Sequence, residues 1–377
     1  MMETVFPGRV GLQQRVIPSY RALFLETLAN ACAGGLGVFA GKPLPNEGIE
    51  SVVDLKIARL THADNKNFID PGSSMYVCWQ SGFLKWLEEW QPEILIVEAN
   101  PRYPVTRRAI SWMHHKGRKV IGWGLGAPAI GGRLKFLRRW ERLSFLRSLD
   151  AIIAYSKRGA EQYYQLGIPQ DYVYVALNAV DTAPQIPPLH RLFTDHGKAT
   201  VLFIGRLQPR KRVDLLLQAC ASLPSDLQPH LVIIGDGPAR TEFEILAHRI
   251  YPEAEFVGAK HGIELKPFFL HADLFVLPGT GGLAIQQAMV HGLPIIVAQG
   301  DGTQDDLVRS ENGWQVPADD LAALTNAIRH ALANPAQLRQ MGNASYQIVV
   351  KEINVEKMVE VFVQALNSLT KYDKSQI

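Results

Sequence analysis

Two basic residues follow an apolar, strand-like run in the second half of the chain. Arg206 comes directly after "VLFIG", and Lys211 lies five residues further on, at the start of a helix-like segment. Two cations beside the first turn of a helix suit a group with the charge of a pyrophosphate, because free amides and the helix dipole also favour anions there. A solvated basic turn is the alternative, since Arg210 and Arg212 lie in the same segment.

Turns rich in glycine follow four strand-like segments in this half. Glycine lets backbone amides approach a bound group where a Cβ would intrude. Four such turns favour an anion site over an ordinary basic turn. The residues at these turns are Gly205, Asp236, Gly237, Gly258, Gly279, Gly281 and Gly282, and Leu283 opens the helix that carries Gln286 and Gln287.

The elements that must position these residues alternate between strand-like and helix-like segments. This alternation predicts an α/β fold with two doubly wound, Rossmann-like domains that face each other across a cleft. Strands are expected at 4–10, 34–40, 93–99, 119–125, 151–156, 201–205, 231–235, 255–258, 274–278, 294–298 and 313–316, and helices at 18–32 and 104–117.

A Pro-rich polar segment after residue 181 predicts the domain boundary. The predicted domains are an N-terminal Rossmann-like domain at 1–183 and a C-terminal Rossmann-like domain at 184–350. A last helix, at 351–377, is expected to pack back toward the N-terminal domain.

Composition limits the classes of protein. A length of 377 residues suits two domains, and a net charge of +3 does not predict nucleic-acid binding. Three scattered cysteines, no signal-peptide pattern and no apolar run near the roughly 20 residues of a membrane span predict a cytoplasmic protein.

The basic, aromatic segment at 133–148 could hold the protein on an anionic membrane, peripherally on its inner face. The alternative is a packed helix whose Arg side chains reach water.

Six stretches occur in an order typical of one family. The second half resembles the nucleotide-sugar-binding domain of GT-B glycosyltransferases, closest to the retaining GT4 family. The first half is similar more loosely, through "GLQQRVIPSYRALF", "AIIAYS" and "NAVD". The six stretches are "GRLQPRK", "LVIIGDGP", "EFVG", "LHADLFVLP", "GLAIQQAMVHGLPIIVA" and "DLVRSENGWQV".

The resemblance implies roles for individual residues. Arg206 and Lys211 would neutralise the donor diphosphate during catalysis, and Gln287 would meet the ribose. The donor-binding set is Gly205, Asp236, Gly237, Gly258, Gly279, Gly281, Gly282, Leu283 and Gln287, and the acceptor-side candidates are Gly11, Arg15, Glu98, Arg102 and Leu125.

Three of these positions depart from the family pattern. Gly279 and Gln287 stand where relatives commonly carry two glutamates eight positions apart, and Leu125 stands where they often carry a histidine. The chemistry needs no dedicated base, however, because the leaving phosphate can accept the acceptor proton.

The predicted activity is that of a retaining hexosyltransferase-like enzyme in polysaccharide biosynthesis. It would move a sugar from a nucleoside-diphosphate sugar to a glycan or lipid-linked acceptor, with no cofactor and no metal, since no Asp-x-Asp triplet occurs. Two alternatives remain: a catalytically silent relative that binds a nucleotide sugar or a partner, and an NAD-dependent dehydrogenase. The second rests on a G-x-G-x-x-A match at 279–284, with Asp301 about 20 residues on.

Overall fold

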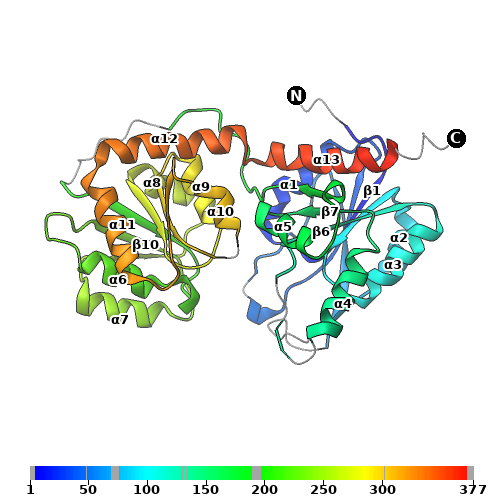
Figure 1. Ribbon diagram of the computed structural model, residues 1–377, viewed down its shortest axis with the longest axis horizontal. Coiled ribbons are helices and arrows are strands. Elements are labelled where there is room, and N and C mark those ends of the chain that lie inside the picture. Colours follow the sequence, from blue (N-terminus) through cyan, green and yellow to red (C-terminus); the bar gives the residue numbers. More distant parts are fainter. Residues whose placement is uncertain are drawn as a thin grey trace. The chain divides into compact units, whose positions relative to one another are not determined.

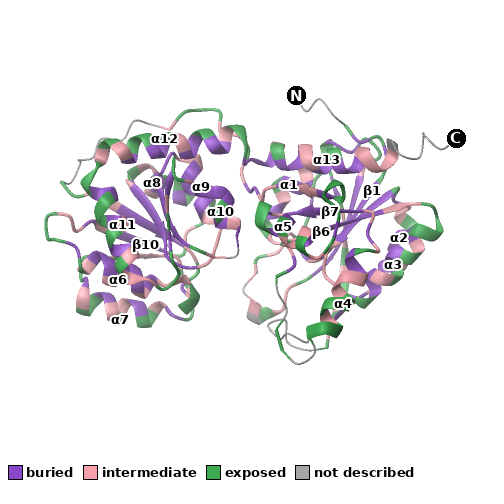
Figure 2. Ribbon diagram, viewed as in Figure 1, coloured by how far each residue is buried: buried purple, intermediate pink, exposed green. Residues whose placement is uncertain are grey.

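The computed structural model describes residues 5–47, 49–68, 76–128, 131–132, 135–188, 197–300 and 302–371. The chain divides into two compact units (Figure 1). Unit 1 comprises Met1–Val180 with Val355–Ile377, and unit 2 comprises Asp181–Asn354. Each unit is built on its own sheet, and buried residues concentrate along the strands of both sheets (Figure 2).

Unit 1 holds an eight-stranded sheet in the order β4-β3-β2-β1-β5-β6-β7-β8. The strands pair in parallel except at the edge, where β4 runs antiparallel to β3. Their bounds are β1 (Val10–Val16), β2 (Leu36–Gly41), β3 (Arg59–Asn67), β4 (Cys78–Ser81), β5 (Ile94–Glu98), β6 (Lys119–Gly124), β7 (Ala151–Ala154) and β8 (Val173–Val175).

The expected first strand at 4–10 was wrong. Pro7 offers no N–H for a strand ladder, and β1 begins only at Val10. Polar residues hid the real strand, because Gln13 and Gln14 are buried within it. Arg15 therefore lies in β1 rather than in the loop after it. The polar strands β3 and β4 were missed for the same reason.

Helices cover both faces of the unit 1 sheet, as a doubly wound fold requires. Ile94 and Ile96 of β5 point into a core with α1 and α13, while Leu95 and Val97 point into a core with α2, α3 and α5. Figure 1 shows α13 lying along α1, although it follows unit 2 in the chain. The helices are α1 (Ala22–Asn30), α2 (Phe83–Trp90), α3 (Pro104–His115), α4 (Lys135–Leu146), α5 (Lys157–Gln165) and α13 (Val355–Lys371).

Unit 2 holds a six-stranded, fully parallel sheet in the order β11-β10-β9-β12-β13-β14. All six strands expected in this half are present. Their bounds are β9 (Thr200–Ile204), β10 (His230–Ile234), β11 (Glu255–Gly258), β12 (Leu274–Leu277), β13 (Ile295–Ala298) and β14 (Gly313–Val316). The helices are α6 (Val213–Ala221), α7 (Arg240–Ile250), α8 (Lys266–His271), α9 (Leu283–Val290), α10 (Thr303–Leu307), α11 (Leu321–Ala333) and α12 (Pro335–Lys351).

The strand order of unit 2 fixes where a ligand should bind. From β9 the chain moves outward through β10 and β11, then returns to the other side of β9 with β12. The switch point therefore lies between β9 and β12, and ligands of such sheets bind outside the carboxyl ends of the strands at that point. No helix in the described part of the chain has the length and apolar character of a membrane span.

Candidate functional site

The turn after β9 and the glycine loop after β12 meet at the switch point of unit 2. Lys211 ends a short 3-10 helix (Pro209–Lys211), and its Nζ donates a hydrogen bond of 2.5 Å to the carbonyl oxygen of Thr280. A Cβ at Gly281 would lie 2.6 Å from this Nζ, and Gly281 has a φ of +154° that favours glycine. The structure thus places the Lys211 ammonium against the glycine loop.

Backbone packing closes the position where relatives carry their first glutamate. The Thr280 amide donates to the Arg210 carbonyl at 3.3 Å, and Arg210 Nη1 donates to the Thr280 hydroxyl at 2.8 Å. A Cβ at Gly279 would overlap that same carbonyl oxygen and lie 2.5 Å from the Cα of Lys211. Any side chain at residue 279 would therefore push the loop away from Lys211.

The other glycine turns lie side by side along the same edge of the sheet. The Gly205 amide donates to Ile234 at 3.0 Å, and the Gly235 amide donates to Gly258 at 2.9 Å. Asp236 belongs to its own turn, where Oδ1 accepts from the Gly237 amide at 2.7 Å. In the order β11, β10, β9, β12, four glycine turns line this edge.

The two glutamines of α9 have different environments. Gln286 is buried, and its Nε2 donates to the Ile353 carbonyl at 2.7 Å, so this side chain is structural. Gln287 is half-buried, and its amide makes no hydrogen bond with any residue that the structure describes. Gly282 caps α9 and Leu283 begins it, while Arg206 is exposed just after β9. Gln287 thus differs from Gln286 in that its side-chain amide has no partner among the described residues.

The dinucleotide alternative gains no support from the topology. Asp301 lies outside the described residues. The loop at 279–282 follows β12, the fourth strand of unit 2 along the chain, whereas such fingerprints follow the first strand of their domain.

Unit 1 has a pocket of about 1220 Å³ at the carboxyl ends of its central strands, here called the unit 1 pocket. Four of the five acceptor-side candidates line it: Arg15, Glu98, Arg102 and Leu125. Gly11 does not, because it lies early in β1, where a Cβ would be 3.0 Å from the ring of Trp86. Gly11 therefore serves packing between β1 and α2.

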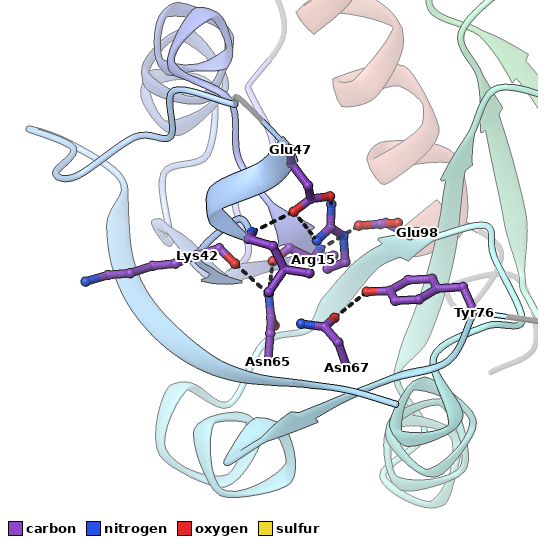
Figure 3. Close-up of polar contacts among 8 residues, drawn as sticks. Arg15, Lys42, Glu47, Asn65, Asn67, Tyr76 and Glu98 are labelled. Carbon is purple, nitrogen blue, oxygen red and sulfur yellow. Dashed lines mark hydrogen bonds and ion pairs between the residues drawn. The ribbon is translucent and has the colours of Figure 1, made fainter. Parts of the chain in front are cut away.

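Arg15 forms an ion pair with Glu47 at one side of the pocket (Figure 3). Its Nη2 lies 2.6 Å and its Nη1 3.1 Å from the two carboxylate oxygens, which is a bidentate geometry. Burial alone would lower the pKa of Arg15, but the hydrogen bonds and charge of Glu47 outweigh it and raise the pKa. Burial alone would raise the pKa of Glu47, but its hydrogen bonds with the Arg15 side chain and the Leu44 amide outweigh burial and lower the pKa.

Glu98 ends β5 and is held from two directions. Its Oε1 accepts the Arg15 amide at 2.5 Å, and Tyr103 supplies a further hydrogen bond. Burial raises the pKa of Glu98, and these hydrogen bonds offset only part of that effect. A fixed carboxyl of this kind can accept hydrogen bonds from sugar hydroxyls.

Three residues that sequence reasoning missed also line the unit 1 pocket. Arg21 lies in a 3-10 helix after β1 (Ser19–Arg21) and is buried beside Trp123 and Tyr155. Burial raises the pKa of Tyr155 to about 12, so its hydroxyl stays protonated. The available signal was the position of both aromatic residues at strand ends, in "VIGWGL" and "AIIAYS".

Two α/β units, each built on a mainly parallel sheet, make up the GT-B fold, and solved structures share this fold. Sucrose-phosphate synthase from Thermosynechococcus elongatus superposes with a TM-score of 0.72 at 18% identity, covering 97% of this chain and 100% of that one. Anabaena HepE, solved in complex with UDP, superposes with a TM-score of 0.70 at 15% identity, covering 96% of this chain and 100% of that one. The prediction of an α/β fold with two doubly wound, Rossmann-like domains is confirmed.

The sequence of unit 2 has recognisable relatives. Residues 190–348 match the family model of the glycosyl transferases group 1, which agrees with the resemblance described above. A GDP-mannose-dependent alpha-mannosyltransferase of Mycobacterium tuberculosis is 32% identical over 193 residues, 49% of this chain and 48% of that protein. The chain thus spans about half the length of this curated relative.

Proposed function

We propose that the chain is a retaining glycosyltransferase that moves a sugar from a nucleoside-diphosphate sugar to a glycan or lipid-linked acceptor. The observation that carries the proposal is the Lys211 ammonium held against the glycine loop, at the switch point of a group 1 domain. The M. tuberculosis relative is named for a GDP-mannose donor, and HepE was solved with UDP, which supports a nucleotide-sugar donor.

The proposed mechanism needs charge stabilisation more than a base. Arg206 and Lys211 neutralise the diphosphate as the sugar–phosphate bond breaks, and the amides at the start of α9 add partial positive charge. The acceptor oxygen bonds to the anomeric carbon of the sugar, and its proton passes to the leaving phosphate. These residues take the role that a metal ion has in metal-dependent transferases, so the nucleotide sugar is the only small molecule required.

A test begins with the donor and ends with turnover. Thermal-shift titration with UDP-, GDP- and ADP-sugars should find one that stabilises the protein by mass action. With that donor, Lys211→Ala or Arg206→Ala should each cost about 2–4 kcal/mol of transition-state stabilisation in kcat/KM. Arg249→Ala is the matched control, because Arg249 is an exposed arginine on α7, and this variant should keep full activity.

Two outcomes would contradict the proposal. Full turnover in Lys211→Ala would remove the assigned role of this residue. Donor binding without any transfer would favour the catalytically silent relative, for which the closed position at Gly279 is the supporting observation.

We also propose that α4 attaches the protein peripherally to the inner face of an anionic membrane, from the cytoplasmic side. Phe136, Leu137 and Trp140 are 76%, 64% and 70% exposed, so these apolar side chains do not pack against the described part of unit 1. Lys135 and Arg139 are exposed beside them. Residues 133–134 of the expected segment lie outside the described residues. An apolar patch ringed by cations suits anionic lipid.

A further inference from the structure

Arg21 and Trp123, which line the unit 1 pocket, each have a side-chain donor with no acceptor among the described residues. Arg21 Nη1 and Trp123 Nε1 are both buried and make no hydrogen bond within the described ranges. Arg21 is 5% exposed and Trp123 is 2% exposed, and both line the pocket. Guanidinium and indole N–H groups can only donate, so both need an acceptor atom.

Arg21 also has no counter-charge among the residues that the structure describes. Its guanidinium carbon lies 4.8 Å from the ring centroid of Trp123 and 5.2 Å from that of Tyr155. No carboxylate among the residues described forms an ion pair with it, whereas Arg15 in the same pocket has Glu47. Ring faces compensate a buried cation only in part, and an unpaired buried charge is costly to keep. A bound anion would compensate the buried charge of Arg21.

The charged residues that line the unit 1 pocket are mainly positive. Its lining contains five arginines and two glutamates. Arg15 is neutralised by Glu47, and Glu98 is already held by the Arg15 amide and Tyr103. Arg21 is in addition the N-cap residue of α1, where the helix dipole adds positive potential. The pocket therefore favours a ligand with a negative group.

We propose that Arg21 and Trp123 form a subsite for an oxyanion, a phosphate or a carboxylate, carried by the acceptor. Arg21 Nη1 and Trp123 Nε1 donate to its oxygens, and the faces of Trp123 and Tyr155 flank the guanidinium. The inference rests on the proposed function in calling the ligand an acceptor. The subsite itself is independent of the donor site, which belongs to unit 2.

The test measures anion binding with the donor site disabled. The full chain carrying Arg206→Ala and Lys211→Ala is the background, so that phosphate bound at the donor site does not contribute. Inorganic phosphate is titrated by calorimetry into this background and into the same chain with Arg21→Met or Trp123→Phe. Arg108→Met is the matched control, because Arg108 also lies over a tryptophan ring, 4.9 Å from the centroid of Trp79, but does not line the pocket.

Arg21→Met should weaken phosphate binding about tenfold or more, since a charge-assisted hydrogen bond is lost. Trp123→Phe keeps an aromatic ring, removes only the donor and should weaken binding by a smaller factor. Arg108→Met should bind as the background does. The melting temperature of Arg21→Met without phosphate should not fall, because an unpaired buried charge has been removed.

A second arm distinguishes two sources of the anion. Phosphatidylcholine vesicles with and without phosphatidic acid are sedimented with the same variants. If Arg21→Met loses the binding that depends on phosphatidic acid, the ligand of the subsite is a lipid head group. If Arg21→Met loses only the binding of inorganic phosphate, the ligand is a soluble phosphate. Unchanged binding of both probes in Arg21→Met overturns the subsite, as does a lower melting temperature with phosphate binding intact. Failure of every nucleotide sugar to bind the wild-type chain would instead count against the proposed function.

Discussion

Gln286 and Gln287 show how neighbouring residues of one type acquire different roles. Gln286 donates to the Ile353 carbonyl, while the side-chain amide of Gln287, on the same helix, bonds to no residue in the described part of the chain. Relatives of the GT4 family use a carboxylate at the second position to accept ribose hydroxyls. An amide offers one neutral acceptor and a donor instead.

Gln287→Glu should tighten donor binding by about 1 kcal/mol, because a charge-assisted hydrogen bond contributes about 1.5–3 kcal/mol and a neutral one about 1 kcal/mol. Calorimetric titration with the preferred nucleotide sugar measures this change. Gln286→Glu is the paired control: it places a charge in a buried site against a carbonyl oxygen, so it should lower stability without tightening binding. Equal or weaker affinity in Gln287→Glu would mean that the ribose is not held by this residue.

Two glutamates in unit 1 should respond to pH in opposite directions. Burial raises the pKa of Glu98, so its contribution to stability is fully present below the unfolded pKa and is lost as pH rises through the folded pKa. The pKa of Glu47 is lowered, chiefly by Arg15 against the effect of burial, so its contribution is present above the unfolded pKa and is lost as pH falls through the folded pKa.

Substitution by glutamine separates these two effects. Glu98→Gln should be at least as stable as wild type near neutral pH, with the advantage shrinking in acid. Glu47→Gln should be less stable than wild type near neutral pH, with the deficit shrinking in acid. Urea unfolding at several pH values from acid to neutral measures both, and parallel pH profiles for the two variants would contradict the assigned causes.

At the level of elements, strands with apolar interiors were predictable and polar ones were not. The six strands of unit 2 are short, mostly apolar runs, and β9, β10 and β11 end at or directly before a glycine, so pattern alone identified them. In unit 1, β1 was misplaced because Gln13 and Gln14 occupy a central strand, where the Gln13 side chain and the Gln14 carbonyl form buried hydrogen bonds with Gln80. Periodicity cannot anticipate such contacts, because the partner comes from an edge strand far along the chain.

The candidate sites show the same division. Lys211 and the glycine loop were predicted, and the structure brings them together at the ends of neighbouring strands. Arg21 was missed, because nothing in "PSYRALF" separates a buried cation from a surface arginine. Its significance appears only when Trp123 and Tyr155, from two other strand ends, close around it.

Helix α4 gives a prediction about membranes. Replacing Phe136 and Trp140 with serine should weaken binding to anionic vesicles by about tenfold or more, because each buried large apolar side chain contributes about 1.5–3 kcal/mol. Vesicle sedimentation at low and high salt measures this. Ile245→Ser is the control, since Ile245 is 67% exposed on α7 of unit 2. Salt-insensitive binding, or none in the wild type, would retire the membrane proposal.

At the scale of the whole molecule, unit 1 is discontinuous in sequence. Its core includes seven buried residues of α13: Val355, Met358, Val359, Phe362, Val363, Ala365 and Leu366. Phe362 packs 4.9 Å from the ring of Phe24 and 5.1 Å from that of Trp123. The helix that ends the described chain thus supports the ring on which Arg21 rests.

Phe362→Ala should destabilise unit 1 by about 3–5 kcal/mol, the usual cost of removing a buried aromatic side chain. Chemical unfolding followed by tryptophan fluorescence should show an earlier transition for this unit. Gln364→Ala, at an exposed position of the same helix, should leave the transition in place. Nucleotide-sugar binding should persist in Phe362→Ala wherever unit 2 remains folded, and an unshifted transition would mean that α13 does not stabilise unit 1.

This discontinuity also dictates an order of events on the ribosome. The eight-stranded sheet emerges first, but the face that α13 covers stays open to water until all of unit 2 has been synthesised. Unit 2 is continuous and can complete its core earlier, although it begins later. During that interval the apolar surface that α13 later covers, beside α1, is exposed on the nascent chain, and chaperones bind surfaces of this kind.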